Sequence, residues 1–314
     1  MHFVPTSPSS SFRPARAVHR QMRVLDARHG RVLLLHGPPS MVSSVMRLVI
    51  WDPIADKQRE LPAPPIAVHP SCWNAAVLCA ATGDSCDHLD CHRRGTFRVV
   101  VVGVHPDRTR MYSCVYSSEP GGVWSTQTMT PSPDLDCYFK LKPSALVWNA
   151  LHFVFTSRTG IAIGILKYDL GTKEMSVIHL PRSIGFHQLH ICLMTMEDGR
   201  LGFVDIGGYK LNIWSRVDGL GRDEGWYQRR VVIDLWMLLP TKFNPYLAIF
   251  GAVGFPGGGG IIFLATAARN FVIDLKSNQA RKLGEDKSFN VVFPFTSFCI
   301  PGNKKLLHTY FIIN

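Results

Sequence analysis

The stretch LVIWDPIADKQREL (48–61) joins an apolar run, a Trp-Asp-Pro break and a polar segment that ends on Leu61. A similar pattern returns in ILKYDLGTKEMSVIHL (165–180). An apolar strand, a tight turn and a polar strand together are typical of a β-hairpin whose second strand lies at an exposed sheet edge. The recurrence therefore predicts a repeated β unit.

Five such breaks occur along the chain, at intervals of 46 to 65 residues. They are Trp51-Asp52, Tyr116-Ser117, Tyr168-Asp169, Trp214-Ser215 and Ile273-Asp274. Four short strands with their turns fill about fifty residues, the length of a propeller blade. The sequence therefore predicts an all-β fold, a single β-propeller of kelch-like design with five or six four-stranded blades.

The residues at the breaks are predicted to be structural. We expect the large rings to pack between blades and the acidic side chains to cap the turn between the third and fourth strands. The rings are Trp51, Tyr116, Tyr168 and Trp214, and the acids are Asp52, Asp169 and Asp274.

The domain boundaries follow from where the strands begin. Residues 1–22 contain prolines at 5, 8 and 14 and are predicted to be a disordered or extended lead-in, while 23–314 form the propeller. The segment NVVFPFTSF (290–298) is free to pair near RVLDA (23–27). Four arginines and no acid before Asp26 leave an organelle transit peptide as the alternative interpretation of the lead-in.

Composition limits the partners. The net charge is +11, but the Arg and Lys pairs are scattered and form no stripe with aromatic residues, which favours a solvated basic surface over nucleic-acid binding. No run of 18 apolar residues occurs, so no membrane association is expected. We expect a monomer in the cytoplasm or nucleus, where the eight cysteines stay reduced.

The segment CDHLDCH (86–92) contains the most suggestive metal ligands, Cys86, His88, Cys91 and His92. Structural zinc sites draw paired ligands from two separated segments, and no second pair is evident here. We therefore interpret the segment as an exposed polar loop and predict no metal and no cofactor. A zinc site and a redox role remain the alternatives.

The chain lacks the motifs of common nucleophilic and metal-dependent hydrolases. It contains no Gly-x-Ser-x-Gly and no His-Glu-x-x-His. On this basis the sequence predicts that the protein is not an enzyme, and that it has no catalytic residues.

Several segments taken together resemble one family, the plant and especially cereal-grass F-box proteins whose carboxy-terminal part is an F-box-associated β-propeller. The resemblance runs from about Phe3 to Pro301. The segments that carry it are RVLDARHGRVLLLH (23–36), LVIWDPIADKQRELPAPP (48–65), AAVLCAA (75–81), FRVVVVG (97–103), VYSSEPGGVWS (115–125), ALVWNALHFVF (145–155), LKYDLGTKEMSVIHLP (166–181) and FVIDLKSNQARKL (271–283).

The resemblance implies the substrate-recognition domain of an SCF-type ubiquitin ligase. In that family a helical F-box precedes the propeller and binds the Skp adaptor, but MHFVPTSP at the start of this chain looks like the linker that follows an F-box. We therefore expect the adaptor to be a partner only of a longer form. The chain as written is expected to bind a protein substrate without the adaptor.

Two other functions stay open. A small-ligand- or sugar-binding propeller needs polar groups on its inner strands, and AVLCA (76–80), ALVWN (145–149) and AIFGA (248–252) are apolar. A nucleic-acid-binding propeller needs a continuous basic surface. The sequence favours a protein-interaction propeller over both.

Overall fold

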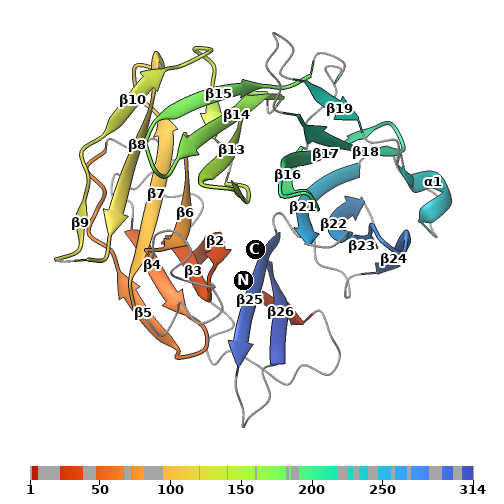
Figure 1. Ribbon diagram of the computed structural model, residues 1–314, viewed down its shortest axis with the longest axis horizontal. Helices are drawn as coiled ribbons and strands as arrows, with labels where there is room; N and C mark the ends of the chain where they lie inside the picture. Colours follow the sequence, from red (N-terminus) through yellow and green to blue (C-terminus); the bar gives the residue numbers. More distant parts are fainter. Residues whose placement is uncertain are drawn as a thin grey trace. The chain divides into compact units, whose positions relative to one another are not determined.

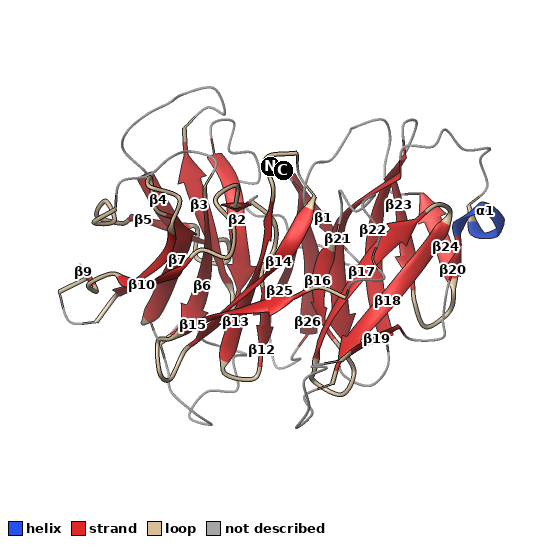
Figure 2. Ribbon diagram, turned by 90° about the horizontal axis from the view of Figure 1, so that it is seen from above, coloured by secondary structure: helices blue, strands red, loops and turns tan. Residues whose placement is uncertain are grey.

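The computed structural model describes most of the chain. The described residues are 2–5, 22–37, 47–66, 72–80, 95–119, 121–139, 141–159, 161–181, 184, 191–217, 225–228, 233–239, 247–255, 259–266, 270–282, 292–299 and 306–313. Strands form nearly all of their regular structure, and the one helix among them is the short α1 (Leu235–Leu238), drawn in blue in Figure 2. No helix of this part of the chain is long and apolar enough to cross a membrane.

The chain packs into two compact units. Unit 1 contains Met1–Leu135 and Val292–Asn314, and unit 2 contains Asp136–Val291. Each is described by itself below. That residues 23–314 form one domain stays a prediction.

Unit 1 contains two blades, coloured orange to yellow in Figure 1. Blade 1 is the antiparallel sheet β2 (Met22–Arg28), β3 (Arg31–His36), β4 (Arg47–Asp52) and β5 (Lys57–Glu60). Blade 2 contains β6 (Trp73–Cys79), β7 (Phe97–Val104), β8 (Arg110–Ser117), β9 (Val123–Trp124) and β10 (Thr128–Pro131). The strand order follows the chain, and the two short strands β9 and β10 both pair with β8.

Unit 2 contains three blades. Blade 3 contains β11 (Tyr138–Phe139), β12 (Ala145–Val147), β13 (Ala150–Thr156), β14 (Ala162–Asp169) and β15 (Met175–His179). Blade 4 contains β16 (Cys192–Thr195), β17 (Leu201–Gly207), β18 (Lys210–Arg216), β19 (Trp226–Gln228) and β20 (Ile233–Asp234). Blade 5 contains β21 (Leu247–Phe255), β22 (Gly259–Thr266), β23 (Asn270–Asp274) and β24 (Gln279–Lys282).

A three-stranded sheet in unit 1 joins the two ends of the chain. Its strands are β1 (His2–Pro5), β26 (Leu306–Ile313) and β25 (Val292–Cys299), in that order. The segment predicted to pair near residues 23–27 instead pairs with β26, although it also contacts β2. The start of the expected lead-in is extended and pairs with β26, and residues 6–21 lie outside the described residues.

The middle strands are apolar on both faces, which requires a neighbouring sheet on each side. Blade 4 shows how the alternation divides its side chains. Phe203 and Trp214 are paired across β17 and β18, and they pack against blade 3. Val204 and Ile213, the next pair, pack against blade 5.

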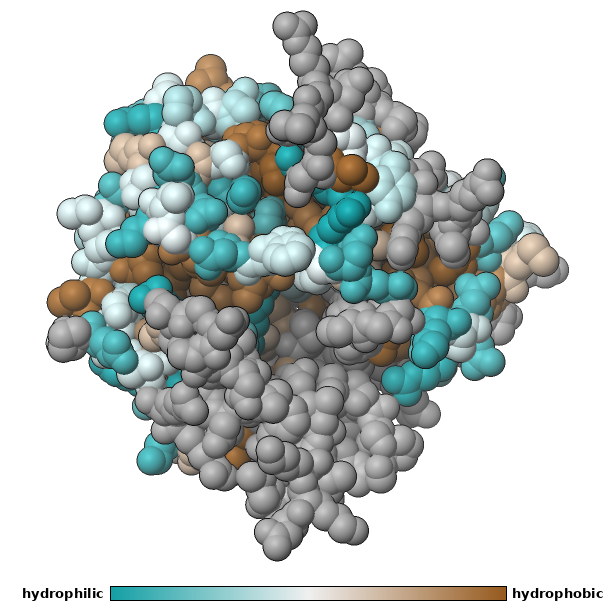
Figure 3. Space-filling view, in the orientation of Figure 1, coloured by the Kyte–Doolittle hydropathy of each residue, from teal (hydrophilic) through white to brown (hydrophobic). Residues whose placement is uncertain are grey.

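The last strands of blades 1 and 5 are polar and largely exposed, in keeping with their position at the sheet edge. All four residues of β5 are exposed, and Gln279, Arg281 and Lys282 of β24 are exposed as well. Figure 3 shows the resulting hydrophilic (teal) surface over the outer part of blade 5, at the right.

Acidic side chains hold the turns before three of the fourth strands. In each turn one carboxylate oxygen accepts hydrogen bonds from the backbone N–H groups two and three residues further on, at 2.8–3.0 Å. The acids are Asp52, Asp169 and Asp274. These bonds lower the pKa of Asp169, chiefly through the N–H of Thr172, and that of Asp274.

The free edge of β6 in blade 2 receives hydrogen-bond partners from blade 1. The buried Asp26, at a bulge in β2, accepts from the N–H of Val77 at 2.9 Å. Nδ1 of His29 accepts from the N–H of Cys79 at 3.0 Å. Burial raises the pKa of Asp26, and Arg28 at 3.4 Å opposes this effect.

An outer-strand tryptophan joins neighbouring blades in each unit. In unit 1, Nε1 of Trp124 on β9 donates to the carbonyl of Pro62, just after β5 of blade 1, at 2.8 Å. In unit 2, Nε1 of Trp226 on β19 donates to the carbonyl of His179, at the end of β15 of blade 3, also at 2.8 Å. In both cases the acceptor is main chain of the preceding blade.

The all-β fold and the β-propeller predicted from the sequence are confirmed. The blades are not uniformly four-stranded, because in blades 2, 3 and 4 two short strands share one side of a longer partner. Blade 4 is one such case, since β19 and β20 pair with opposite ends of β18.

We expect Trp214→Ala to lower the free energy of unfolding by about 3–5 kcal/mol, the usual cost of removing a buried Trp side chain. Trp214 is 7% exposed and stacks on Phe203, with ring centroids 5.8 Å apart. Trp148→Ala is the matched control, because Trp148 is 79% exposed and its loss should change stability by less than about 0.5 kcal/mol. Urea denaturation measures both, and equal stabilities of the two variants would contradict the blade register.

A cationic pocket between blades 3 and 4

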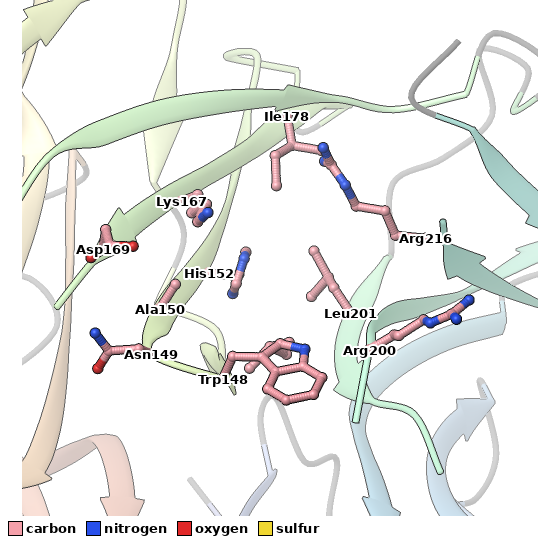
Figure 4. A pocket seen from close by; sticks show the side chains of 11 residues that line it. Trp148, Asn149, Ala150, His152, Lys167, Asp169, Ile178, Arg200, Leu201 and Arg216 are labelled. Atoms are coloured by element: carbon pink, nitrogen blue, oxygen red, sulfur yellow. The ribbon is translucent and has the colours of Figure 1, made fainter. Parts of the chain in front are cut away.

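A pocket of about 210 Å³ lies within unit 2, where blade 3 meets blade 4 (Figure 4). Its walls are side chains from β12, β13, β14 and β15 on one side and from β17 and β18 on the other. The lining residues are Val147, Trp148, Asn149, Ala150, His152, Lys167, Asp169, Ile178, Arg200, Leu201 and Arg216.

The register of the strands explains why polar side chains meet there. His152 of β13 is paired with Lys167 of β14, two residues along each strand from the pair Val154 and Ile165, which packs against blade 4. Side chains two residues apart on a strand share a face, so His152 and Lys167 face blade 4 as well. Arg216 of β18 lies two residues after Trp214 and faces blade 3. The pocket is the polar end of an otherwise apolar layer.

Trp148 occupies the mouth of the pocket at the tip of the two-residue hairpin between β12 and β13. Its φ of 52° is in the left-handed region, which a hairpin of this length usually gives to Gly, Asn or Asp. The ring is 79% exposed, and its Cζ2 lies 3.8 Å from where a Cβ on Gly199 would be. The strained backbone beside the pocket makes Trp148 a candidate functional residue.

His152 is buried beneath this mouth. Its side chain lies between Lys167 and Arg216 in Figure 4, and its Nδ1 has no hydrogen-bond partner among the described residues. Burial lowers the pKa of His152 to about 4, and the positive charges of Lys167 and Arg216 add to this effect. The imidazole is therefore neutral at pH 7.

The lining contains more cationic than acidic side chains. Three cationic side chains, Lys167, Arg200 and Arg216, face a single carboxylate, Asp169, which is already bonded to its own turn. Arg200 is half exposed and lies 3.6 Å from Asp198, an exposed pair that contributes little. The pocket therefore offers positive charge, hydrogen-bond donors and an aromatic surface to a ligand.

With one exception, the break residues singled out in the sequence lie outside the pocket. Trp51, Tyr116, Tyr168 and Trp214 are buried, and Asp52 and Asp274 lie in turns. Only Asp169 lines the pocket. Cys86, His88, Cys91 and His92 lie outside the described residues, and the described part of the chain contains no group of three or more His, Cys, Asp or Glu that could hold a metal ion.

Sequence reasoning missed the pocket residues Trp148, His152, Lys167, Arg200 and Arg216. The segment ALVWN was judged too apolar to bind a ligand, but the polar groups come from other strands. A signal was present, because His152 and Lys167 interrupt the apolar side of ALHFVF (150–155) and AIGILKYD (162–169). Their meeting with Arg216 follows only from the packing of two blades.

The sheets and their order define a β-propeller protein, and comparison with known families is more specific. Residues 23–240 match the model described as F-box protein AT5G49610-like, β-propeller. The chain belongs to this family. The match spans blades 1 to 4 and α1, a shorter stretch than the resemblance seen in the sequence. No curated protein sequence matches the chain.

Solved structures with a similar fold share little sequence. The Aleuria aurantia lectin, in complex with α-methyl-L-fucoside, is 11% identical with a TM-score of 0.51, over 88% of this chain and 82% of the lectin. The Penicillium chrysogenum α-L-arabinanase is 11% identical with a TM-score of 0.48, over 99% and 96%. The Fusarium graminearum α-L-arabinofuranosidase is 12% identical with a TM-score of 0.48, over 99% and 96%.

These structures correct one prediction. The sequence predicted that the protein is not an enzyme, and this prediction is contradicted, because an α-L-arabinanase and an α-L-arabinofuranosidase are among the structures similar to the chain. At such low identity the likeness concerns the fold alone and assigns no activity to this chain.

We expect the stability of the protein to fall as the pH is lowered from about 6.5 to about 4. Across this range the unfolded chain takes up a proton at residue 152 and the folded chain does not, because the pKa of His152 is lowered. The loss from this residue is up to about 3 kcal/mol. The groups facing the imidazole are Lys167, Arg216 and, at the pocket rim, Asp169 and Arg200.

Urea denaturation at several pH values, compared with His152→Gln, isolates this contribution. Asp26 and Asp205, whose pKa values are raised by burial, add an effect of the opposite sign that is the same in both proteins. Identical pH slopes for wild type and His152→Gln would show that the imidazole is not held neutral.

Proposed function

We propose that the chain is a partner-recognition domain that binds a protein through the pocket between blades 3 and 4. Its membership of a family described as F-box protein supports a more specific role, the recognition of substrates for an SCF-type ubiquitin ligase. The observation that carries the proposal is Trp148, an exposed ring on a strained backbone at the mouth of a cationic pocket.

The residue types around the mouth match those that dominate protein interfaces. Trp and Arg are enriched among the residues whose truncation costs most of the binding energy, whereas most surface contacts are nearly neutral. Trp148 and Arg200 lie together at the rim, and Figure 4 shows the indole extending toward Leu201 and Arg200. A partner side chain inserted here would be covered by the Trp148 ring and excluded from water.

Quantitative affinity purification of the full chain tests this proposal. We expect Trp148→Ala to lose a reproducible set of proteins that wild type retains, at least tenfold by mass spectrometry. Trp236→Ala is the matched control, because Trp236 is also exposed in unit 2 but lies on α1, away from the pocket.

Two results would contradict the proposal. One is the same set of captured proteins for wild type, Trp148→Ala and Trp236→Ala. The other is a set that Trp236→Ala loses equally, which would indicate general exposure of apolar rings and not a site at Trp148.

A second candidate is the binding of a small hydroxylated ligand such as a sugar in the same pocket. It is favoured by the presence of an aromatic ring beside several side-chain donors, the usual composition of small-ligand sites. A glycan that raises the melting temperature of wild type and not that of Trp148→Ala would favour this function over protein recognition.

A further inference from the structure

We propose that the pocket between blades 3 and 4 binds one neutral sugar ring. This inference rests on the second candidate function above and names the class of ligand that the site takes. It follows from the partners of the charged side chains, from the mixture of hydrogen-bonding groups in the lining and from the exposed ring of Trp148.

The cationic side chains of the lining are not all available to an anion. Arg200 lies 3.6 Å from Asp198, and Arg216 has an interaction partner of its own. Lys167 and Asp169 have opposite charges and lie two residues apart on β14, so they share a face of the sheet. The lining therefore does not select an anion over an uncharged ligand.

The lining offers both donors and acceptors, which is the pattern that hydroxyl groups match. Lys167 only donates, the carboxylate of Asp169 only accepts, and the amide of Asn149 does both. Nδ2 of Asn149 and Oδ1 of Asp169 lie together, 3.1 and 3.3 Å from the position that a Cβ on Gly171 would have. Because a hydroxyl group donates and accepts, neighbouring hydroxyls of a sugar can bind an acceptor and a donor side by side.

Asp169 keeps one carboxylate oxygen for a ligand. Its hydrogen bonds from the main-chain N–H groups of Thr172 and Gly171, at 3.0 and 2.9 Å, both end on Oδ1. Oδ2 can therefore accept from a ligand hydroxyl without opening the turn. The same two bonds lower the pKa of Asp169, so the carboxylate is ionised at pH 7 and is a stronger acceptor than a neutral oxygen.

His152 supplies an independent observation from inside the pocket. The residue is 4% exposed, and its Nδ1 has no hydrogen-bond partner among the described residues. A buried polar atom without a partner costs free energy. The ring is neutral, so Nδ1 either donates or accepts, and a hydroxyl group satisfies either tautomer.

The ring of Trp148 and the size of the cavity favour a single sugar ring. The face of an aromatic ring carries partial negative charge and attracts the polarised C–H groups on the flat side of a sugar. Trp148 is 79% exposed at the mouth, with Asn149 and Asp169 at one end of the pocket in Figure 4. Sites for drug-sized ligands measure roughly 300–1,000 Å³, and this pocket measures about 210 Å³. One sugar ring is smaller than such ligands and presents both C–H groups and hydroxyls.

Saturation-transfer difference NMR of the full chain with four neutral glycosides tests the inference. The probes are methyl β-D-glucopyranoside, methyl β-D-galactopyranoside, methyl α-D-mannopyranoside and methyl β-D-xylopyranoside. We expect at least one of them to bind, with an affinity that changes less than twofold between about 0.1 M and about 1 M salt, because salt screens charged ligands and not neutral ones. Inorganic phosphate should not displace it.

Asp169→Asn is the decisive variant. An Asn amide keeps the acceptor oxygen of the turn and replaces the other oxygen by an NH₂ group, so the turn stays and the acceptor for the sugar is lost. We expect the bound glycoside to be weakened at least tenfold. Asp274→Asn is the matched control, because it makes the same change in the equivalent turn of blade 5, outside the pocket, and should change the affinity less than twofold.

Three results would overturn the inference. They are binding of none of the four glycosides, equal weakening by Asp169→Asn and Asp274→Asn, and displacement of the glycoside by inorganic phosphate. The last would assign the pocket to an anion. Circular dichroism and melting temperatures of both variants establish that they are folded.

Competition in the capture experiment separates this inference from protein recognition. If an excess of the bound glycoside releases the proteins whose capture depends on Trp148, the sugar is carried by the partner protein. If those proteins stay captured while Asp169→Asn still weakens the glycoside, the inference stands with a free sugar as the ligand. If no glycoside binds and capture still depends on Trp148, the sugar inference fails and protein recognition stands.

Discussion

Burial of the middle strands on both faces is the constraint on which the rest of the molecule depends. Blade 4 has two apolar faces, one formed by Phe203 and Trp214 and the other by Val204 and Ile213. Each face would be exposed to water unless a neighbouring sheet covered it. Blades 3 and 5 provide that cover. The same constraint locates the pocket, because a polar side chain on a covered face, such as His152, needs a partner of its own. Where the apolar side chains on a covered face are replaced by polar ones, the space between two blades can bind a ligand.

The local features of the fold could be predicted from sequence because their causes are local. An apolar run followed by Asp and a short turn predicts the strands β4, β14 and β23 and the turns after them. The polar residues after two of these turns predict the edge strands β5 and β24. What could not be predicted depends on contacts between distant segments. The pairing of β1 with β26 joins the two ends of the chain, and nothing in HFVP (2–5) specifies its partner.

The candidate site was missed for the same physical reason. Its lining combines residues from two blades, and neither Arg200 nor Arg216 differs in sequence context from a solvated arginine. Reasoning from motifs recognises groups that act within a few residues of each other. A pocket built at a junction between blades has no such signature.

The tryptophan that joins neighbouring blades has a consequence for how such a protein can evolve. Trp124 and Trp226 each donate to a main-chain carbonyl of the preceding blade, at Pro62 and His179. A carbonyl is present whatever residue occupies the position, so the donor needs no matching side chain in the repeat before it. A duplicated blade would carry the tryptophan donor of this hydrogen bond with it. The side chains of the preceding blade could then change without loss of the bond. Recognition residues can therefore diversify from repeat to repeat while the connections between repeats are kept.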